Sequence, residues 1–184
     1  QVERGRVLLA AAKQRLQEGG VDQVRSLHRH GGIVETILER EADARVVVIG
    51  KRGAGHEFAS DHIGSKIERV VRASDRPILI ASRAVSEPGA IVFAFDASKS
   101  ANRALERLVN SPLFTGLPVH IVMADSENAV HRQALDDAAG QLRDSHEVRT
   151  TLRQGKPETV IADIVNQTPG AMLMMGAYGH SPLR

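Results

Sequence analysis

Two glycine-bearing turns are the first features of this sequence that suggest chemistry. Gly50-Lys51-Arg52-Gly53 follows an apolar run that ends at Ile49, and Gly176-Ala177-Tyr178-Gly179 follows the run Ala171–Met175. Glycines at the end of a strand allow the backbone to approach a phosphate closely, because no Cβ intervenes. Gly64-Ser65 begins the next predicted helix, whose N-terminal N–H groups and Ser65 hydroxyl also suit a phosphate. The alternative is that these glycines only form turns and Ser65 only caps a helix.

Asp96 is the third candidate, because it directly follows the apolar run Ile91–Phe95. A carboxylate at that position can accept hydrogen bonds from ribose hydroxyls or from the adenine amino group. The alternative is a helix cap, in which Asp96 or Ser98 accepts from an early N–H group. His180, beside the second glycine turn, has no second ligand at metal-binding spacing and is interpreted as a polar loop residue.

Alternating strands and helices must position these residues, and this predicts an α/β fold with an open parallel sheet. The unbroken β-branched run within Ala44–Ile49 predicts a strand that is buried on both faces. The other expected strands are Val21–Leu27, Ile78–Ile80, Ile91–Phe95, Val119–Met123, Val148–Leu152 and Ala171–Met175. The expected helices are Arg6–Glu18, Ile33–Glu39, Gly64–Ala73, Asp96–Leu108, Asn128–Leu142 and Glu158–Val165.

Apolar spacing also predicts which side of each early helix is buried. Within Arg6–Glu18, the inner side should hold Val7, Leu8, Ala11 and Leu16. Within Ile33–Glu39, the inner side should hold Ile33, Ile37 and Leu38.

An internal repeat relates the two halves of the chain. Val24-Arg25 precedes Val148-Arg149 by 124 residues, and Gly50 precedes Gly176 by 126. We therefore expect two copies of one domain, at 1–83 and 91–184, joined by a linker at 84–90. Both copies are expected to be incomplete: the first without its opening βαβ unit, the second ending soon after its glycine turn. A permuted arrangement, in which the pieces complete one sheet, is the alternative.

Composition excludes several classes of function. The net charge is only +2 and aromatic residues make up 3%, which disfavours nucleic-acid binding. There are no cysteines, so disulfides, thiolate metal sites and cysteine nucleophiles are excluded. No apolar stretch of about 20 residues exists to span a membrane. We therefore expect a cytoplasmic protein without a protein metal site. P-loop, dinucleotide-fingerprint and nucleophile-elbow motifs are also absent.

Together these residues resemble the universal stress protein A (UspA) family, whose hallmark is Gly-x-x-Gly followed by Gly-Ser or Gly-Thr, with an aspartate after the first strand. The resemblance covers nearly the whole chain and implies a bacterial tandem-domain member, present as a partial chain. It implies a Rossmann-like sandwich of the adenine-nucleotide alpha-hydrolase type. By this resemblance, Asp96 faces ribose or adenine and the Val122 backbone contacts adenine. The implied phosphate-facing residues are Gly50, Gly53, Gly64 and Ser65 in the first copy and Gly176, Gly179, His180 and Ser181 in the second.

The function implied is a stress-response protein that binds ATP or AMP, with or without Mg, and has little or no catalysis. We predict no catalytic residue, and expect a homodimer or an intramolecular pairing of the two domains. A nucleotide-independent dimerising interaction module is one alternative; the ten residues between Gly53 and Gly64, with their acidic Glu57 and Asp61, favour it for the first copy. A slow ATPase is the other alternative. We expect the second copy to be the nucleotide site.

Overall fold

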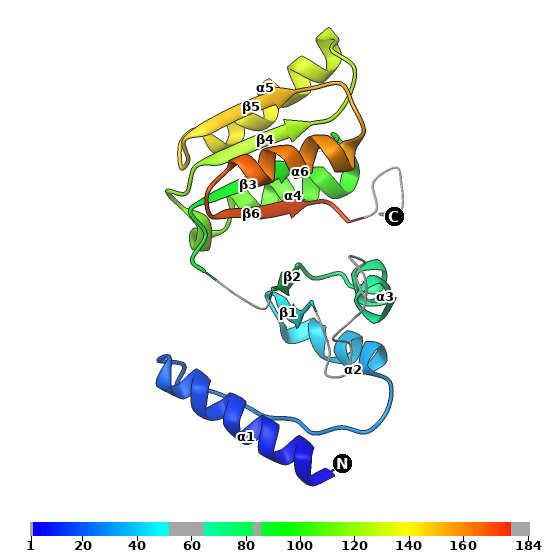
Figure 1. The fold of residues 1–184 in the computed structure, drawn as a ribbon, viewed down its shortest axis with the longest axis vertical. Helices are drawn as coiled ribbons and strands as arrows, with labels where there is room; N and C mark the ends of the chain where they lie inside the picture. The colour runs from blue at the N-terminus through cyan, green and yellow to red at the C-terminus, as the bar shows by residue number, and fades with distance from the viewer. Residues whose placement is uncertain (1, 52–64, 83–85, 178–184) are drawn as a thin grey trace. The chain divides into compact units, whose positions relative to one another are not determined.

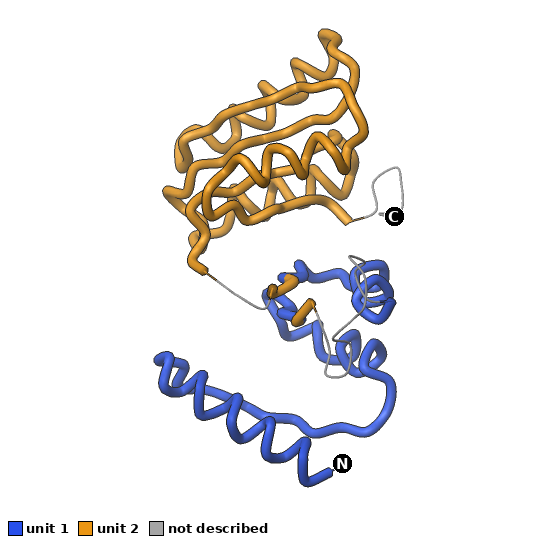
Figure 2. Tube along the Cα trace, viewed as in Figure 1, with its two compact units in different colours: residues 1–49, 64–79 blue, residues 50–63, 80–184 orange. Residues whose placement is uncertain are grey.

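The computed structural model describes residues 2–51, 65–82 and 86–177. It shows an α/β fold with open parallel sheets, which confirms the predicted fold class. The chain divides into two compact units: residues 1–49 and 64–79 form unit 1, and residues 50–63 and 80–184 form unit 2 (Figure 2). The domain limits expected from the sequence stay a prediction.

Unit 2 is built on a four-stranded sheet in the order β5-β4-β3-β6. All three neighbouring pairs are parallel. The strands are β3 (Ala90–Ala94), β4 (Val119–Met123), β5 (Val148–Leu152) and β6 (Ala171–Met175). Each lies within one residue of its predicted position. The helices between them are α4 (Lys99–Val109), α5 (Ala129–Leu142) and α6 (Pro157–Gln167), and a short 3-10 helix, η2 (Pro112–Phe114), precedes β4.

The helices cover both faces of this sheet (Figure 1). On one face, Ile91 and Phe93 of β3 pack with Leu105 of α4 and Leu135 of α5. On the other face, a smaller cluster joins residues of β3 and β4 to two residues of α6: Val92, Val122, Val160 and Ile164. The reversal of strand order explains this arrangement. Right-handed crossovers place α4 and α5 on one face, and the return from β5 across to β6 places α6 on the other.

Side-chain caps fix where two of these helices begin. Ser98 Oγ accepts a hydrogen bond from the Ala101 N–H at 3.2 Å, so α4 begins at Lys99. Asn128 Oδ1 accepts from the His131 N–H at 2.8 Å at the start of α5. Each cap satisfies an N–H group that lacks a partner within its helix.

Unit 1 contains three α-helices, two of which pack together, and most of a two-stranded sheet, β1-β2. The Val47 N–H donates to the Pro77 carbonyl and the Lys51 N–H to the Ala81 carbonyl, so both strands advance in the same direction. The limit between the units runs through this small sheet. The elements are α1 (Val2–Glu18), α2 (Ile33–Arg40), the 3-10 helix η1 (Glu41–Asp43), β1 (Val47–Gly50), α3 (Ser65–Ala73) and β2 (Ile78–Ala81).

The first two predicted elements differ from the structure. The segment predicted as a strand, Val21–Leu27, has no strand in the structure. A strand needs a neighbour for its backbone hydrogen bonds, and no described segment pairs with this one. α1 begins at Val2 rather than Arg6 and buries none of its residues. No other described helix or strand packs closely on α1. The residues of its predicted inner side are therefore exposed: Val7, Leu8, Ala11 and Leu16.

Two burial predictions in unit 1 also differ from the structure, one of them only in part. β1 is not buried on both faces, since the Val48 side chain is 61% exposed. In the described part of the chain, helices do not cover both faces of this two-stranded sheet, so its apolar run alternates between covered and exposed positions. In α2 the prediction holds in part: Ile37 and Leu38 are half-buried, whereas Ile33 at the first helical position is exposed and Val34 is buried instead.

A buried carboxylate organises the end of unit 1. Glu41, in η1, is 9% exposed and accepts hydrogen bonds from the Ser74 hydroxyl and the Asp75 N–H. Arg76 Nε donates to the Glu41 carbonyl at 3.1 Å. These bonds tie the α3–β2 connection to the end of α2, which brings β2 alongside β1.

We expect Glu41→Ala to lower the free energy of unfolding by about 1.5–3 kcal/mol, because a buried charged acceptor with two donors is lost. Urea denaturation monitored by circular dichroism measures this change. The control is Glu35→Ala, which removes an exposed ion pair with Arg69 (3.0 Å) and should leave the free energy of unfolding nearly unchanged. Equal losses for the two variants would contradict the role given to Glu41.

His120 provides a pH-dependent test of the unit 2 sheet. Its Nε2 lies 2.8 Å from Thr151 Oγ1 on the neighbouring strand β5. Burial, and then the nearby Arg149 guanidinium, lowers the pKa of His120 below its ordinary value of 6.5. The fold therefore favours the neutral imidazole. This contribution is present above the ordinary pKa and is lost as the pH falls below it toward the folded-state pKa.

We expect the free energy of unfolding to decrease from about pH 7 to about pH 5 more steeply in the wild type than in His120→Gln. Denaturant titrations at several pH values measure the two slopes. The same pH dependence in both proteins would show that His120 does not contribute.

Candidate functional site

The sheet of unit 2 has one place where its strand order reverses. The chain passes from β3 to β4 and β5 on one side, then returns to place β6 on the other side of β3. The carboxyl ends of β3 and β6 lie next to each other, with Ala94 in register with Met175. In open α/β sheets, ligands bind outside the carboxyl ends of strands at such a reversal. We take this edge as the candidate site.

The Asp96 turn forms one side of the candidate site. Asp96 is exposed directly beyond β3, and its Oδ1 accepts a hydrogen bond from the Ser98 N–H at 3.0 Å. Ser98, not Asp96, caps α4. Among the described residues, the second carboxylate oxygen of Asp96 has no hydrogen-bond partner. Ser98 Oγ caps the helix, so the second oxygen of Asp96 is left available to a ligand.

Ala97 carries backbone strain within the same turn. Its φ is 55°, and among the described residues it is the one non-glycine residue with positive φ. The left-handed region costs an L-residue about 1–2 kcal/mol because Cβ approaches the carbonyl oxygen. This conformation reverses the chain between β3 and α4 and leaves the Asp96 carboxylate at the edge of the sheet. Strain of this kind is frequent at functional sites.

The Gly176 turn forms the other side. A Cβ built at Gly176 would lie 2.6 Å from the Ala101 nitrogen and 2.7 Å from the Ser100 carbonyl carbon. Glycine is therefore required here by the close approach of the first turn of α4. A Gly176→Val change would disturb this contact with α4 whether or not a nucleotide binds, so it cannot isolate a ligand contact.

Val122 lies in the sheet beside this edge. Its side chain is 1% exposed and packs in the cluster beneath α6. Its carbonyl oxygen accepts a hydrogen bond from the Phe95 N–H at 2.9 Å, which extends the ladder between β3 and β4 up to the Asp96 turn. The predicted contact of the Val122 backbone with adenine stays a prediction.

The remaining predicted site residues belong to the first copy or lie beyond Ala177. Gly50 ends β1 and Ser65 begins α3. Lys51, next to Gly50, donates its N–H to the Ala81 carbonyl of β2. The other predicted residues lie outside the described part of the chain: Gly53, Gly64, Gly179, His180 and Ser181. The structure thus brings together Asp96, Gly176 and the strand that carries Val122.

The sequence did not single out a polar cluster at the end of β4. Asp125 Oδ1 accepts from the Ser126 N–H at 2.6 Å, and His131 Nδ1 lies 3.7 Å from the same oxygen. The Ser126 N–H, opposed by desolvation and aided by His131, lowers the pKa of Asp125 below its ordinary value. A serine and an aspartate before a helix are common, so their sequence pattern alone gives no functional signal.

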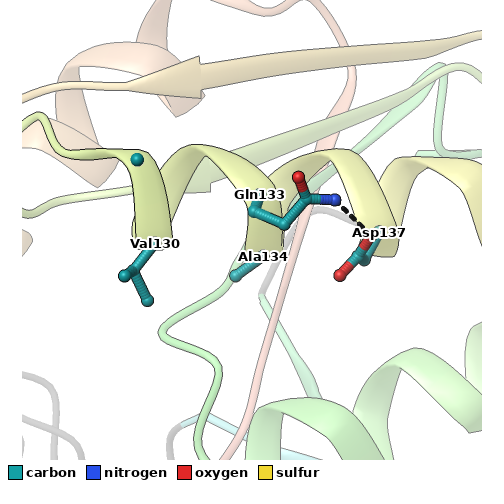
Figure 3. Close-up of a pocket in the computed structure, with 5 residues that line it drawn as sticks. Val130, Gln133, Ala134 and Asp137 are labelled. Atoms are coloured by element: carbon teal, nitrogen blue, oxygen red, sulfur yellow. Dashed lines mark hydrogen bonds between the residues drawn. The ribbon is translucent and has the colours of Figure 1, made fainter.

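The described residues hold no group of three His, Cys, Asp or Glu side chains able to bind a metal ion. An open cavity of about 460 Å³ lies along α5 instead, lined by Ala129, Val130, Gln133, Ala134 and Asp137. Figure 3 shows Val130, Ala134 and Asp137 on one side of this helix, with Gln133 bonded to Asp137 at 2.8 Å. None of the predicted site residues lines this cavity. We prefer the strand-order reversal as the site, because it joins two independently predicted turns.

The chain is similar to known proteins along nearly its whole length. "Universal stress protein Slr1230" of Synechocystis sp. is 28% identical over 185 residues, covering 99% of this chain and 64% of that protein. The chain thus spans slightly less than two thirds of this relative. A solved universal stress protein from Archaeoglobus fulgidus matches with a TM-score of 0.76 and 24% identity, covering 94% of this chain and 66% of that one. No known protein-family profile matches the chain. Among the described residues, no helix is long and apolar enough to span a membrane.

We expect Ala97→Gly to raise the free energy of unfolding by about 0.5 kcal/mol. It removes a left-handed penalty of about 1–2 kcal/mol and adds a glycine entropy cost of about 0.5–1 kcal/mol. Ala101→Gly, inside α4 and 1% exposed, is the opposite case and should lose about 1 kcal/mol. Chemical denaturation of both variants measures these changes; a destabilised Ala97→Gly would refute the strain at this turn.

Proposed function

Since the chain is a homologue of the universal stress proteins, we propose that it is a stress-response protein that binds ATP or AMP between the carboxyl ends of β3 and β6. The observation that carries this proposal is the meeting of the Asp96 and Gly176 turns at the reversal of strand order. These turns are 80 residues apart in sequence, and the family resemblance assigns a nucleotide contact to each.

In this proposal each side of the site has a separate role. The Asp96 carboxylate uses one oxygen to hold its own turn and offers the other to ribose hydroxyls or to the adenine amino group. The Gly176 turn, which continues toward Gly179, His180 and Ser181, faces the phosphates. The Val122 backbone faces adenine. Mg bound to the phosphates is compatible with this arrangement, and no protein metal site is needed.

We also propose that the protein has little or no catalytic activity, as its similarity to the universal stress proteins implies. The tandem arrangement of two related domains, their pairing within the chain or between two copies, and a cytoplasmic location belong to the same proposal. The order α2, β1 in unit 1 and α6, β6 in unit 2, with a glycine at the end of β1 and directly after β6, supports the duplication. We propose unit 2 as the nucleotide site and leave unit 1 without an assigned ligand.

Titration calorimetry with ATP and AMP tests the binding proposal. Asp96→Asn keeps an oxygen for the Ser98 N–H but loses the charge, so we expect affinity to fall about tenfold or more. Asp144→Ala is the control, because Asp144 is exposed and precedes β5, at the amino ends of the strands. Affinity should be unchanged in that variant.

The two negative results have different meanings. No heat with either nucleotide, for protein shown to be folded, removes the nucleotide-binding proposal and favours an interaction module. Binding that is equally tight in the wild type and in Asp96→Asn would place the ribose away from this turn.

A further inference from the structure

Two serine hydroxyls lie between the halves of the candidate site. Ser98 Oγ and Ser100 Oγ are 3.0 Å apart and share a hydrogen bond, and both residues are half-buried. Ser98 Oγ also accepts from the Ala101 N–H, which fixes its position at the start of α4. The Ser100 hydroxyl is therefore oriented by a partner that the helix cap already holds in place.

The opposite side of Ser100 contacts the Gly176 turn. A Cβ at Gly176 would lie 2.8 Å from Ser100 Oγ, in addition to its contacts with the backbone of Ser100 and Ala101. The Ser98 N–H donates in turn to Asp96 Oδ1 at 3.0 Å. A continuous series of contacts thus runs from Asp96 through Ser98 and Ser100 to Gly176, and it joins two turns whose strands meet only through the β3–β6 ladder.

We propose that Ser100 is a positioning residue that sets the spacing between the Asp96 turn and the Gly176 turn. The inference rests on the proposed function in one respect: this spacing would decide how well the site accepts a nucleotide with phosphates compared with a bare nucleoside. Ribose is held on the Asp96 side and phosphate on the Gly176 side. A displaced Gly176 turn therefore weakens phosphate contacts while leaving the nucleoside contacts in place.

Ser100→Ala tests this inference, because it removes the hydroxyl and alanine keeps the helix. Without the hydroxyl, the Gly176 backbone loses a packing contact and gains freedom to move. We expect faster hydrogen exchange at the Gly176 and Ala177 amides of the full chain without any nucleotide. We expect ATP affinity to fall about three- to tenfold, because the Ser98–Ser100 hydrogen bond that orients this contact is lost, and adenosine affinity to stay within about twofold.

Ser111→Ala is the matched control. Ser111 Oγ also accepts a backbone N–H, from Leu113 at 3.4 Å, but at η2, before the amino end of β4. This variant should change neither the exchange at Gly176 nor the ratio of ATP affinity to adenosine affinity.

The readouts separate the inference from the proposed function. Unchanged exchange at Gly176 in Ser100→Ala overturns the positioning role. Faster exchange with equal losses of ATP and adenosine affinity overturns the selectivity. If the wild type binds no nucleotide, the proposed function and the selectivity fail together, while faster exchange still supports Ser100 as the residue that positions the turn.

Discussion

The burial of β3 on both faces is the constraint on which the structure of unit 2 depends. Ile91, Val92 and Phe93 are each 0% exposed, so alternate residues must be covered from opposite sides. One helical layer cannot do this. The chain meets the requirement by placing α4 and α5 on one face and α6 on the other. With right-handed crossovers, helices on both faces require the strand order to reverse beside β3. The candidate site is a consequence of the same requirement, because the reversal brings the ends of β3 and β6 together.

Small residues and short polar contacts fix the backbone at the edge formed in this way. Gly176 meets the start of α4 at a distance that excludes a side chain, and Ala97 accepts a strained φ so that the chain can reverse after β3. Both features fix backbone, and backbone N–H groups suit a ligand that carries phosphates. The Asp96 carboxylate lies at the opposite end of a short series of hydrogen bonds through Ser98 and Ser100, which engages Oδ1 and leaves the second oxygen free.

Unit 1 also has a sequence of alternating apolar strand and helix segments, but fewer of its strands are paired than in unit 2. Its sheet has two strands, so the apolar run of β1 is partly exposed, and no described strand packs against α1. Its most specific interaction is polar instead: buried Glu41 receives the Ser74 hydroxyl and the Asp75 N–H and so places β2 beside β1. The residues of Val21–Leu27 favour a strand, but no described segment pairs with them and they form none. Residue preference identifies a segment that can form a strand, but the strand forms only when an adjacent strand pairs with its backbone N–H and C=O groups.

The sequence alone determined the strands and helices of unit 2, the α/β class and the two turns, because buried strands, amphipathic helices and glycine turns leave local patterns. It correctly placed β5 at Val148–Leu152 and placed Asp96 within one residue of its observed position, two residues after the end of β3. Only the tertiary structure decided that α1 lies exposed, that Ser98 rather than Asp96 caps α4, and that Glu41 is a buried acceptor. It also revealed why residue 176 must be glycine. That reason is a contact with Ser100 and Ala101, far away in sequence, and no local pattern encodes such an approach.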